Sequence, residues 1–487
     1  MAERSLLRDV RIDGRAVDLL IASGRIVAIG AHISPREART TWQGRGRDVL
    51  PGLRDAHVHF TDWALARSTS TLSRSLRGAV TVEEIVNVVH AAALRGQGAD
   101  WVIAEGFQPG ALTGVAPHKS QLDEALPGLP IALTSVDGHS AWLSSAALAQ
   151  LGLDHDTGLL REHDVWAMES RLPWPATVDL DDLVNGAVGE ALALGVTSIV
   201  DYQMRDGLDG WLRRAAHEPL RLRVEAAVMR HELDEAIADG RRTGQRLAGS
   251  DRLTIGRLKL FADGALGSRT AGCDHGYVGD QGNRGLLLFE EDELAGELVH
   301  AARHGFEATV HAIGDRANAM VLNAFARTGL QGRVEHAQLL RRDDMSRMAG
   351  LGLEASVQPI HAVDDRDLAE RWWSDRLDRA YCHRSLALAG VPLLLGTDAP
   401  VANFDPWANL AAACNRTIDD RPPWLPDQRL ELGQAVRAAT VGELEVGAPA
   451  DLLVMDQPIR AETLADLAGA RPVATMLAGD WVSGPPE

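Results

Sequence analysis

The stretch Leu50-Pro-Gly-Leu-Arg-Asp-Ala-His57-Val-His59-Phe60 decides the fold and the chemistry that we expect of this chain. Side chains of a strand alternate between its two faces, so His57 and His59 lie on one face while Val58 lies on the other. Two imidazoles that point the same way favour a metal ion, because histidine is the commonest metal ligand. The same spacing also fits an ordinary hydrogen-bonded pair, so this stretch alone leaves both interpretations open.

Four more polar residues lie in strand-like segments farther along the chain: Lys259, His311, His336 and Asp398. The last three come at or near the end of a short β-prone run, just before Gly, Pro or a polar loop. In a barrel of parallel strands the active site forms at the carboxyl ends of the strands. Any one of these residues could be a satisfied core residue, but their shared position at successive strand ends indicates one common site.

Strand-like and helix-like segments alternate through the middle of the chain. The helix-like segments, such as 181–195 and 291–305, begin with acidic residues and end at Gly. This alternation implies parallel strands with right-handed crossovers, and eight such units close a barrel. We therefore predict an α/β fold, a (β/α)8 TIM barrel, with strands in segments 50–60, 195–202, 220–229, 258–262, 307–311, 333–336, 354–358 and 391–398.

Both ends of the chain are typical of short strands joined by Gly turns. We predict a small β-sandwich domain built from residues 1–50 and 441–487, and a barrel over residues 51–440. Residues 61–180 are too many for one crossover, so we expect a long insertion after the first barrel strand. The insertion is either a lid over the metal-bearing face or a plain stabilising addition.

Composition restricts the partners of the protein. The 487 residues include 49 Lys and Arg against 68 Asp and Glu, a formal charge of −19, which disfavours nucleic-acid and membrane partners. The sequence has no apolar run of about 18 residues and no secretory signal, which predicts a cytoplasmic protein. Three widely spaced cysteines argue against a disulfide framework. We expect a small-molecule substrate and, as the commonest default, a homodimer.

Several short motifs spread over the chain carry a family resemblance. They are Pro51-Gly-Leu-Arg-Asp-Ala-His-Val-His59, Lys259, Val310-His-Ala-Ile-Gly-Asp315, Val334-Glu-His336, Gly396-Thr-Asp398 and Gly447-Ala-Pro-Ala-Asp451. Together they resemble the amidohydrolase superfamily. Lys259-Leu-Phe-Ala-Asp-Gly-Ala-Leu-Gly-Ser-Arg-Thr270 and Asp137-Gly-His-Ser-Ala-Trp142 resemble its branch of N-substituted formamide deformylase-like metal-dependent hydrolases. Arg54 departs from the family pattern, which usually has an apolar residue there.

The resemblance implies six metal ligands: His57, His59, Lys259, His311, His336 and Asp398. The first two and Asp398 would bind the more buried ion, and His311 and His336 the more exposed one. Lys259 matches a lysine that, in two-metal members, carries CO2 as a carbamate and bridges both ions. Such a lysine must be a neutral amine, which burial beside cations favours by lowering its pKa. The alternative for Lys259 is a surface lysine or the partner of a carboxylate.

The implied cofactor is a divalent metal, most simply two zinc ions, with manganese, iron, cobalt or nickel as substitutes. A bound cation can lower the pKa of water from 15.7 to about 7, which makes hydroxide available at neutral pH. Asp398 would be the general base that takes the proton and delivers it to the leaving nitrogen. The resemblance thus implies a hydrolase of the C–N bond of a small amide, N-acyl or N-formyl compound.

Three further residues are expected on the substrate side of the site. His139 would reach the substrate from the insertion, Arg269 would orient a polar group by a forked contact, and His361 would line the pocket after the seventh strand. Each has a structural alternative, such as a histidine packed next to Trp142 or a solvated loop arginine. Asp263 and Asp315 would be carboxylates that steer a ligand without binding the metal.

Two other functions stay open at this stage. A deaminase of a heterocycle that uses one metal would share most of the same ligands. A paralogue that binds a small molecule without catalysis is disfavoured because every proposed ligand is present. The identity of the substrate is beyond the sequence, since a fold does not imply a function.

Overall fold

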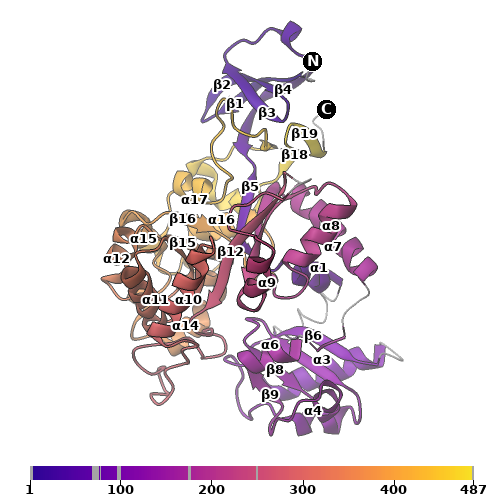
Figure 1. Ribbon diagram of the computed structural model, residues 1–487, viewed down its shortest axis with the longest axis vertical. Coiled ribbons are helices and arrows are strands. Elements are labelled where there is room, and N and C mark those ends of the chain that lie inside the picture. The colour runs from indigo at the N-terminus through magenta and orange to yellow at the C-terminus, as the bar shows by residue number, and fades with distance from the viewer. Residues whose placement is uncertain are drawn as a thin grey trace.

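The computed structural model describes residues 4–68, 76, 78–95, 100–169, 171–173, 177–247 and 251–484. The described strands form three sheets, of eight, seven and four strands. Figure 1 shows the seven-stranded sheet at one end of the long axis, the four-stranded sheet at the other end, and the eight-stranded sheet between them. The middle sheet is the one that carries the predicted site.

The eight-stranded sheet is a barrel of parallel strands in which neighbours follow the chain order. It closes just beyond the last strand, where the Asp398 backbone N–H donates to the carbonyl oxygen of His57 at 2.7 Å. Gly396 permits this approach, because a Cβ there would lie 2.5 Å from the His57 backbone nitrogen. The predicted (β/α)8 barrel is confirmed, with strands β5 (Leu53–Val58), β10 (Val196–Asp201), β11 (Arg223–Met229), β12 (Leu253–Phe261), β13 (Ala308–Ala312), β14 (Gly332–His336), β15 (Glu354–Val357) and β16 (Leu393–Leu395).

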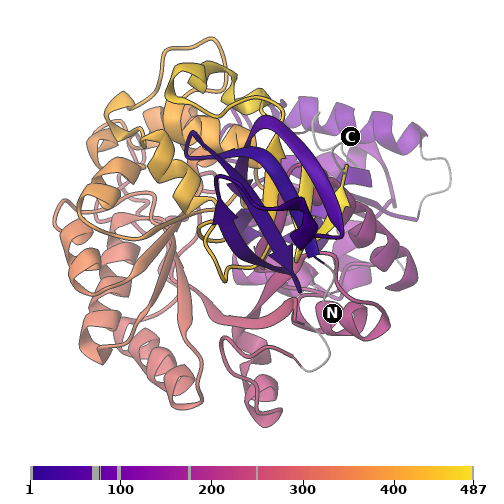
Figure 2. The same cartoon turned by 90° about the horizontal axis from the view of Figure 1, so that it is seen from above.

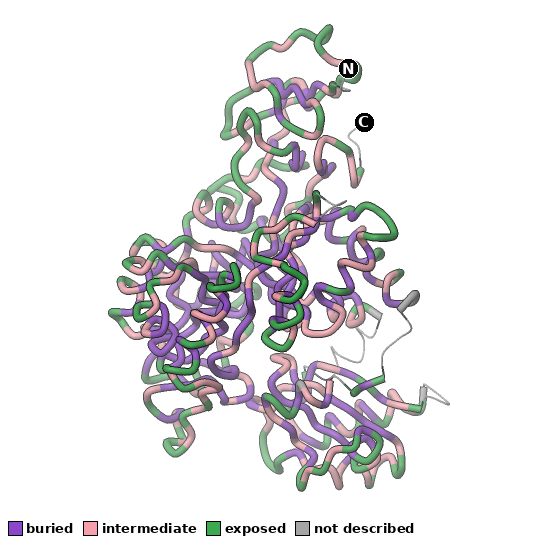
Figure 3. The backbone as a smooth tube through the Cα atoms, viewed as in Figure 1, coloured by how far each residue is buried: buried purple, intermediate pink, exposed green. Residues whose placement is uncertain are grey.

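Helices surround the barrel, as the view from above shows (Figure 2). In α10 the residues Leu294, Leu298 and Ala301 recur at helical spacing and are buried, while acidic residues fill its first turn. Buried residues follow the barrel strands, and exposed residues lie over the outer helices and loops (Figure 3). The helices of the barrel are α1 (Phe60–Ser68), α7 (Thr177–Ala193), α8 (Leu208–His217), α9 (Leu233–Ala238), α10 (Glu291–Arg303), α11 (Asp315–Thr328), α12 (Asp344–Gly350), α13 (Pro359–Asp364), α14 (Arg366–Trp372), α15 (His383–Leu388), α16 (Pro406–Asn415) and α17 (Leu432–Ala438).

The seven-stranded sheet contains strands from both ends of the chain. Its shared member, β4, pairs in parallel with β1 and antiparallel with β17, so it joins the two halves. Buried residues of both halves, among them Leu7, Leu19, Leu452 and Met476, pack in one cluster. A β-sandwich built from the termini was therefore a correct expectation, with strands β1 (Arg4–Ile12), β2 (Arg15–Ala22), β3 (Arg25–Gly30), β4 (Thr40–Pro51), β17 (Leu452–Met455), β18 (Pro472–Leu477) and β19 (Asp480–Ser483).

The four-stranded sheet lies within the predicted insertion. Part of that insertion, residues 69–75, 77, 96–99, 170 and 174–176, falls outside the described residues. The Oγ of Ser268, in the loop after β12, donates to Asp137 of the insertion at 2.8 Å, and Arg161 donates to the Ser268 carbonyl oxygen at 2.8 Å. These bonds fasten the insertion to the barrel. Its elements are α3 (Val82–Arg95), β6 (Val102–Phe107), α4 (Lys119–Ala125), β7 (Ile131–Ser135), β8 (Ser140–Leu143), α5 (Ser145–Leu151), β9 (Leu159–Arg161) and α6 (His163–Glu169).

Short 3-10 helices complete the described chain at η1 (Pro35–Glu37), η2 (Arg230–Glu232), η3 (Leu377–Arg379), η4 (Pro426–Gln428) and η5 (Ala461–Gly469). Among the described residues, no helix combines the length and the apolar character that a bilayer crossing requires.

Candidate metal centre

A cavity of about 340 Å³ lies at the carboxyl end of the barrel, between the barrel and the insertion. Its lining includes His57 and Asp398 from the barrel and Glu105, Thr134 and His139 from the insertion. Cavities of this size, roughly 300 Å³ and upward, accommodate small-molecule ligands. The insertion therefore forms part of the cavity wall, beside the predicted metal ligands.

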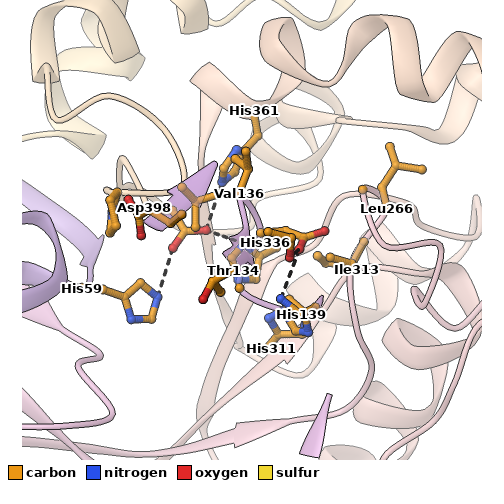
Figure 4. Close-up of a pocket in the computed structure, with 18 of the residues that line it drawn as sticks. His59, Thr134, Val136, His139, Leu266, His311, Ile313, His336, His361 and Asp398 are labelled. Carbon is orange, nitrogen blue, oxygen red and sulfur yellow. Dashed lines mark hydrogen bonds and ion pairs between the residues drawn. The ribbon is translucent and has the colours of Figure 1, made fainter. Parts of the chain in front are cut away.

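Asp398 lies at the centre of the imidazoles in this cavity (Figure 4). Its Oδ1 is 3.2 Å from Nε2 of His59 and 3.5 Å from Nε2 of His57. Its Oδ2 is 3.0 Å from Nε2 of His361 and 3.9 Å from Nδ1 of His336. Burial by itself would raise the pKa of Asp398, but these histidines hold it well below its usual range. Asp398 is thus an ionised carboxylate shared by two groups of potential ligands, His57-His59-Asp398 and His336-His361-Asp398.

Asp55 explains why Pro-Gly-Leu-Arg-Asp precedes the two histidines. Its Oδ1 accepts the backbone N–H of His57 at 3.1 Å and that of Thr397 at 2.9 Å, and its Oδ2 accepts the Thr397 hydroxyl at 2.5 Å. One buried carboxylate therefore joins the ends of the first and last barrel strands. This connection places His57 and Asp398 beside each other, although they are far apart in the sequence.

Two of the predicted ligands have a backbone conformation that is unusual for residues with a side chain. The φ angle is +73° at His336 and +59° at Asp398, both in the left-handed region. Such conformations cost about 1–3 kcal/mol each and persist where the surrounding structure imposes them, most often at functional sites. The strain at both strand ends therefore supports a functional role for this cluster.

His311 and His336 lie on neighbouring strands with ring centroids 4.5 Å apart. Burial lowers the pKa of both well below the usual value, so both are neutral imidazoles, the form that binds metals. His336 Nδ1 contacts Oε1 of Gln358 at 2.9 Å, whereas His311 Nε2 is 3.1 Å from the Gly264 carbonyl oxygen. Asp263 accepts backbone N–H groups of Gly272, Ile313 and Gly314, which fixes the loop after β13.

Lys259 is buried at the floor of the cavity. Its Nζ lies 4.3 Å from the Tyr202 ring centroid, and burial lowers its pKa to about 8. Within the described chain, Lys259 Nζ is buried without a hydrogen-bond partner. Buried polar atoms almost always have partners, so this amine indicates that something else binds here. Imidazole nitrogens with carboxylate oxygens suit a divalent metal such as zinc, and the residues present fit that group.

The structure adds a buried carboxylate that the sequence analysis missed. Glu335 is fully buried, and its Oε2 lies 2.6 Å from Nδ1 of His57. Its Oε1 accepts hydroxyl groups from Tyr202 at 2.8 Å and Thr309 at 2.5 Å. The available signal was a charged residue next to His336 in a short apolar strand. That signal does not say which residues Glu335 contacts.

The predicted substrate-side residues differ in their positions. His139 lines the cavity with its ring 5.3 Å from that of His311, and its Nδ1 is 2.7 Å from Oε2 of Glu162. Burial favours a lower pKa for His139, but the charge of Glu162 outweighs this and raises it to about 9. His361 also lines the cavity and contacts Asp398 directly, so it is nearer to the predicted ligands than expected.

The position of Arg269 does not match its predicted role. Its guanidinium group is paired with Asp280 at 3.1 Å and lies 4.8 Å from the Trp372 ring centroid. Arg269 is absent from the described lining of the cavity. The loop that carries it turns at Arg269 itself, whose φ is +54°, and a turn of this kind cannot be read from residue types alone.

Comparisons with known proteins place this site in context. The N-substituted formamide deformylase of Arthrobacter pascens is 24% identical over 90% of this chain and 90% of its own length. Protein LONG AFTER FAR-RED 3 of Arabidopsis thaliana is 27% identical over 90% of this chain and 84% of its own. The crystal structure of an uncharacterized metal-dependent hydrolase from Pyrococcus horikoshii OT3 covers 94% of this chain and 98% of its own, with a TM-score of 0.76 and 26% identity.

The sequence profile described as the amidohydrolase family matches residues 45–483, which include all six predicted metal ligands. The match extends from β4 through the whole barrel to β19. Together with the barrel and the histidine-aspartate centre at its carboxyl end, this match shows that the chain belongs to the amidohydrolase family.

Proposed function

We propose that the protein is a metal-dependent hydrolase that cleaves the C–N bond of a small amide, N-acyl or N-formyl compound. The observation that carries this proposal is the position of Asp398, an ionised carboxylate within 4 Å of four imidazoles. The name of the Arthrobacter pascens relative, an N-substituted formamide deformylase, supports the choice of bond.

The proposed ligands divide into two groups. His57, His59 and Asp398 would hold one divalent ion, and His311 and His336 would hold a second. When bound, such ions lower the pKa of water and polarise a carbonyl group. Lys259 lines the same cavity as a buried amine whose lowered pKa favours the neutral form that reacts with CO2. We propose that its carbamate, formed with loss of one proton from the nitrogen, completes the ligand set.

Two side chains would then move or hold protons. Asp398 would accept a proton from the attacking water at a carboxylate oxygen and deliver it to the leaving nitrogen. His361 donates to Oδ2 of Asp398. This hydrogen bond would keep the carboxylate in one orientation while it accepts the proton from water and then delivers it to the leaving nitrogen. His139, held by Glu162, presents a charged imidazole to the cavity and would donate a hydrogen bond to a substrate oxygen.

The cavity wall favours a neutral substrate. Among the described lining residues there is no arginine, and the one lysine is Lys259 at the floor. Carboxyl groups of Asp62, Glu105 and Glu169 line the same wall, and burial raises the pKa of Glu169 to about 8, so this group is mostly protonated at neutral pH. A substrate that carries a free carboxylate would find no guanidinium fork there, which is the usual protein partner of that group. Apolar side chains such as Phe107 and Leu266 leave room for a hydrophobic substituent.

The experiment is a metal analysis of the purified protein combined with a substrate screen. The panel contains N-formyl and N-acyl amines, cyclic amides and, as compounds without a C–N bond to cleave, the matching esters. We expect bound divalent metal and turnover of an amide that is lost with a chelator and restored by metal. A protein that binds no divalent metal, or that cleaves esters but no amide, would contradict the proposal.

A one-metal deaminase is the second candidate function. It is favoured by the compact group of His57, His59 and Asp398, since Nε2 of His311 instead faces the Gly264 carbonyl oxygen. Lys259→Ala separates the two candidates. A bridged pair loses metal with this variant, whereas a single-metal deaminase keeps both its metal content and its release of ammonia from a heterocyclic amine. Lys119→Ala, a lysine of the insertion outside the cavity lining, is the matched control.

A further inference from the structure

Glu335 lies one layer below the candidate metal ligands, inside the barrel. It stands on β14, next to His336 in the sequence, yet its carboxylate contacts His57 on β5. These two strands are not neighbours in the sheet, so the contact crosses the barrel interior. At 2.6 Å it is among the shortest contacts of any candidate ligand.

Both carboxylate oxygens of Glu335 have hydrogen-bond partners. Oε2 contacts Nδ1 of His57, and Oε1 accepts hydroxyl groups from Tyr202 and Thr309. Every contact of this side chain is therefore one that a carboxylate makes as an acceptor.

The protonation of His57 follows from this contact. A carboxylate only accepts hydrogen bonds, so the proton of the neutral imidazole must be on Nδ1. The lone pair is then on Nε2, the atom that lies 3.5 Å from Asp398 and faces the cavity. Tyr202 packs against the same ring at a centroid distance of 4.4 Å and limits its rotation.

The other imidazoles are held differently. His336 contacts the neutral amide of Gln358, and both His59 and His361 contact Asp398 itself. Nε2 of His311 also lies 3.6 Å from Oδ1 of Asp263, so His57 makes the closer of the two contacts with a carboxylate other than Asp398, at 2.6 Å. Partners of this kind fix the tautomer of a ligating histidine and increase its basicity.

We propose that Glu335 is a positioning residue, which holds His57 with Nε2 directed at the metal. This inference rests on the proposed metal-dependent function. It adds a residue that acts through one ligand without touching the ion or the substrate. Tyr202 and Thr309 donate to the opposite oxygen, Oε1, so either can lose its hydroxyl while Oε2 keeps its contact with His57.

The test measures zinc affinity of the metal-depleted full chain by competition with a chromophoric chelator. Glu335→Leu removes the charge and the acceptor, and we expect the dissociation constant to rise by about 10–100-fold. Glu335→Gln keeps an acceptor for Nδ1 and should recover part of that loss. Thr309→Val is the matched control, since it removes a hydrogen bond of the same buried carboxylate but leaves the contact with His57; we expect a change of less than about threefold.

The thermal midpoints of the metal-free proteins separate positioning from a purely structural role. A structural role predicts that Glu335→Gln and Thr309→Val lower the midpoint alike and leave zinc affinity unchanged. The inference is overturned if Glu335→Gln and Glu335→Leu both bind zinc within threefold of the unmodified protein, or if Thr309→Val loses as much affinity as Glu335→Leu. If Glu335→Leu does not fold, the comparison of zinc affinity between Glu335→Gln and Thr309→Val tests the inference. An unmodified protein that binds no zinc would instead contradict the proposed function.

Discussion

The two ends of the barrel interior differ in how their charged side chains are paired. At the amino end, ion pairs join five residues from five strands: Arg54, Glu225, Arg257, Arg333 and Glu354. Their closest contacts lie between 2.6 and 3.6 Å, and two of them, Arg54 with Glu225 and Arg257 with Glu354, join strands that are not neighbours. At the carboxyl end, several imidazoles share one aspartate, and Lys259 Nζ has no hydrogen-bond partner in the described chain.

This difference indicates what each end requires. At the amino end each arginine pairs with at least one glutamate, so these charges have partners within the chain and contribute to the stability of the fold. At the carboxyl end several imidazole nitrogens converge on one carboxylate, and the lone pairs of neutral imidazoles that face the cavity are satisfied when a cation is bound. The predictions that follow test whether stability and function are separated in this way.

The largest effect is expected for Asp398→Asn. Removing the proposed general base should lower kcat/KM for the best amide by about 10²–10⁴-fold, the usual contribution of such a group. The matched variant at the other end of the barrel is Glu354→Gln, which should keep turnover within about twofold because it touches no cavity residue. Equal turnover of Asp398→Asn and the unmodified enzyme would remove Asp398 from the reaction.

Removal of the metal should affect the carboxyl end alone. Because a ligand that binds only the folded state stabilises it, zinc at 100 times its dissociation constant should add about 2.7 kcal/mol to the free energy of unfolding. Calorimetry with and without a chelator measures this difference. Addition of zinc to His57→Ala should give a much smaller gain, and an equal gain in both proteins would place the binding site elsewhere.

Arg257→Met breaks the charged layer at the amino end. Arg257 contacts Glu225, Glu307 and Glu354, and its side chain is 17% exposed. Loss of one partner from a buried ion pair costs about 3–5 kcal/mol, and partial exposure reduces this to about 2 kcal/mol here. We expect the free energy of unfolding measured in urea to fall by this amount, while kcat stays unchanged. Arg303→Met, at an exposed helix position, is the control and should change stability by less than about 0.5 kcal/mol.

The smallest effect concerns the pair of His139 and Glu162. The pKa of His139 is raised to about 9 in the folded protein, above its ordinary value near 6.5. The pair therefore stabilises the fold fully below about pH 6.5, and this contribution is lost as the pH rises through 9. The thermal midpoint of the metal-free protein should fall between pH 7 and 9.5, and the fall should be shallower in Glu162→Gln. Parallel pH profiles for the two proteins would show that His139 does not titrate in this range.

How much of the site could be predicted depends on how local each feature is. The alternation of His57 and His59, and the positions of His311, His336 and Asp398 at strand ends, are properties of single strands, and the structure brings these residues together. Arg269 lies outside the described cavity lining, and its guanidinium group is paired with Asp280. His361 follows the seventh strand as expected, but its direct contact with Asp398 depends on the path of α13.

The sequence by itself determined the (β/α)8 barrel, the end of the barrel that carries the chemistry, and the residue types that meet there. Periodicity and strand order suffice for these, because parallel strands all end on the same side. Only the tertiary structure decided that Glu335 holds His57, that Asp55 joins the first and last strands, and that five charged residues close the amino end. These contacts cross the interior between distant strands, and the common tilt and stagger of all eight strands sets which side chains meet.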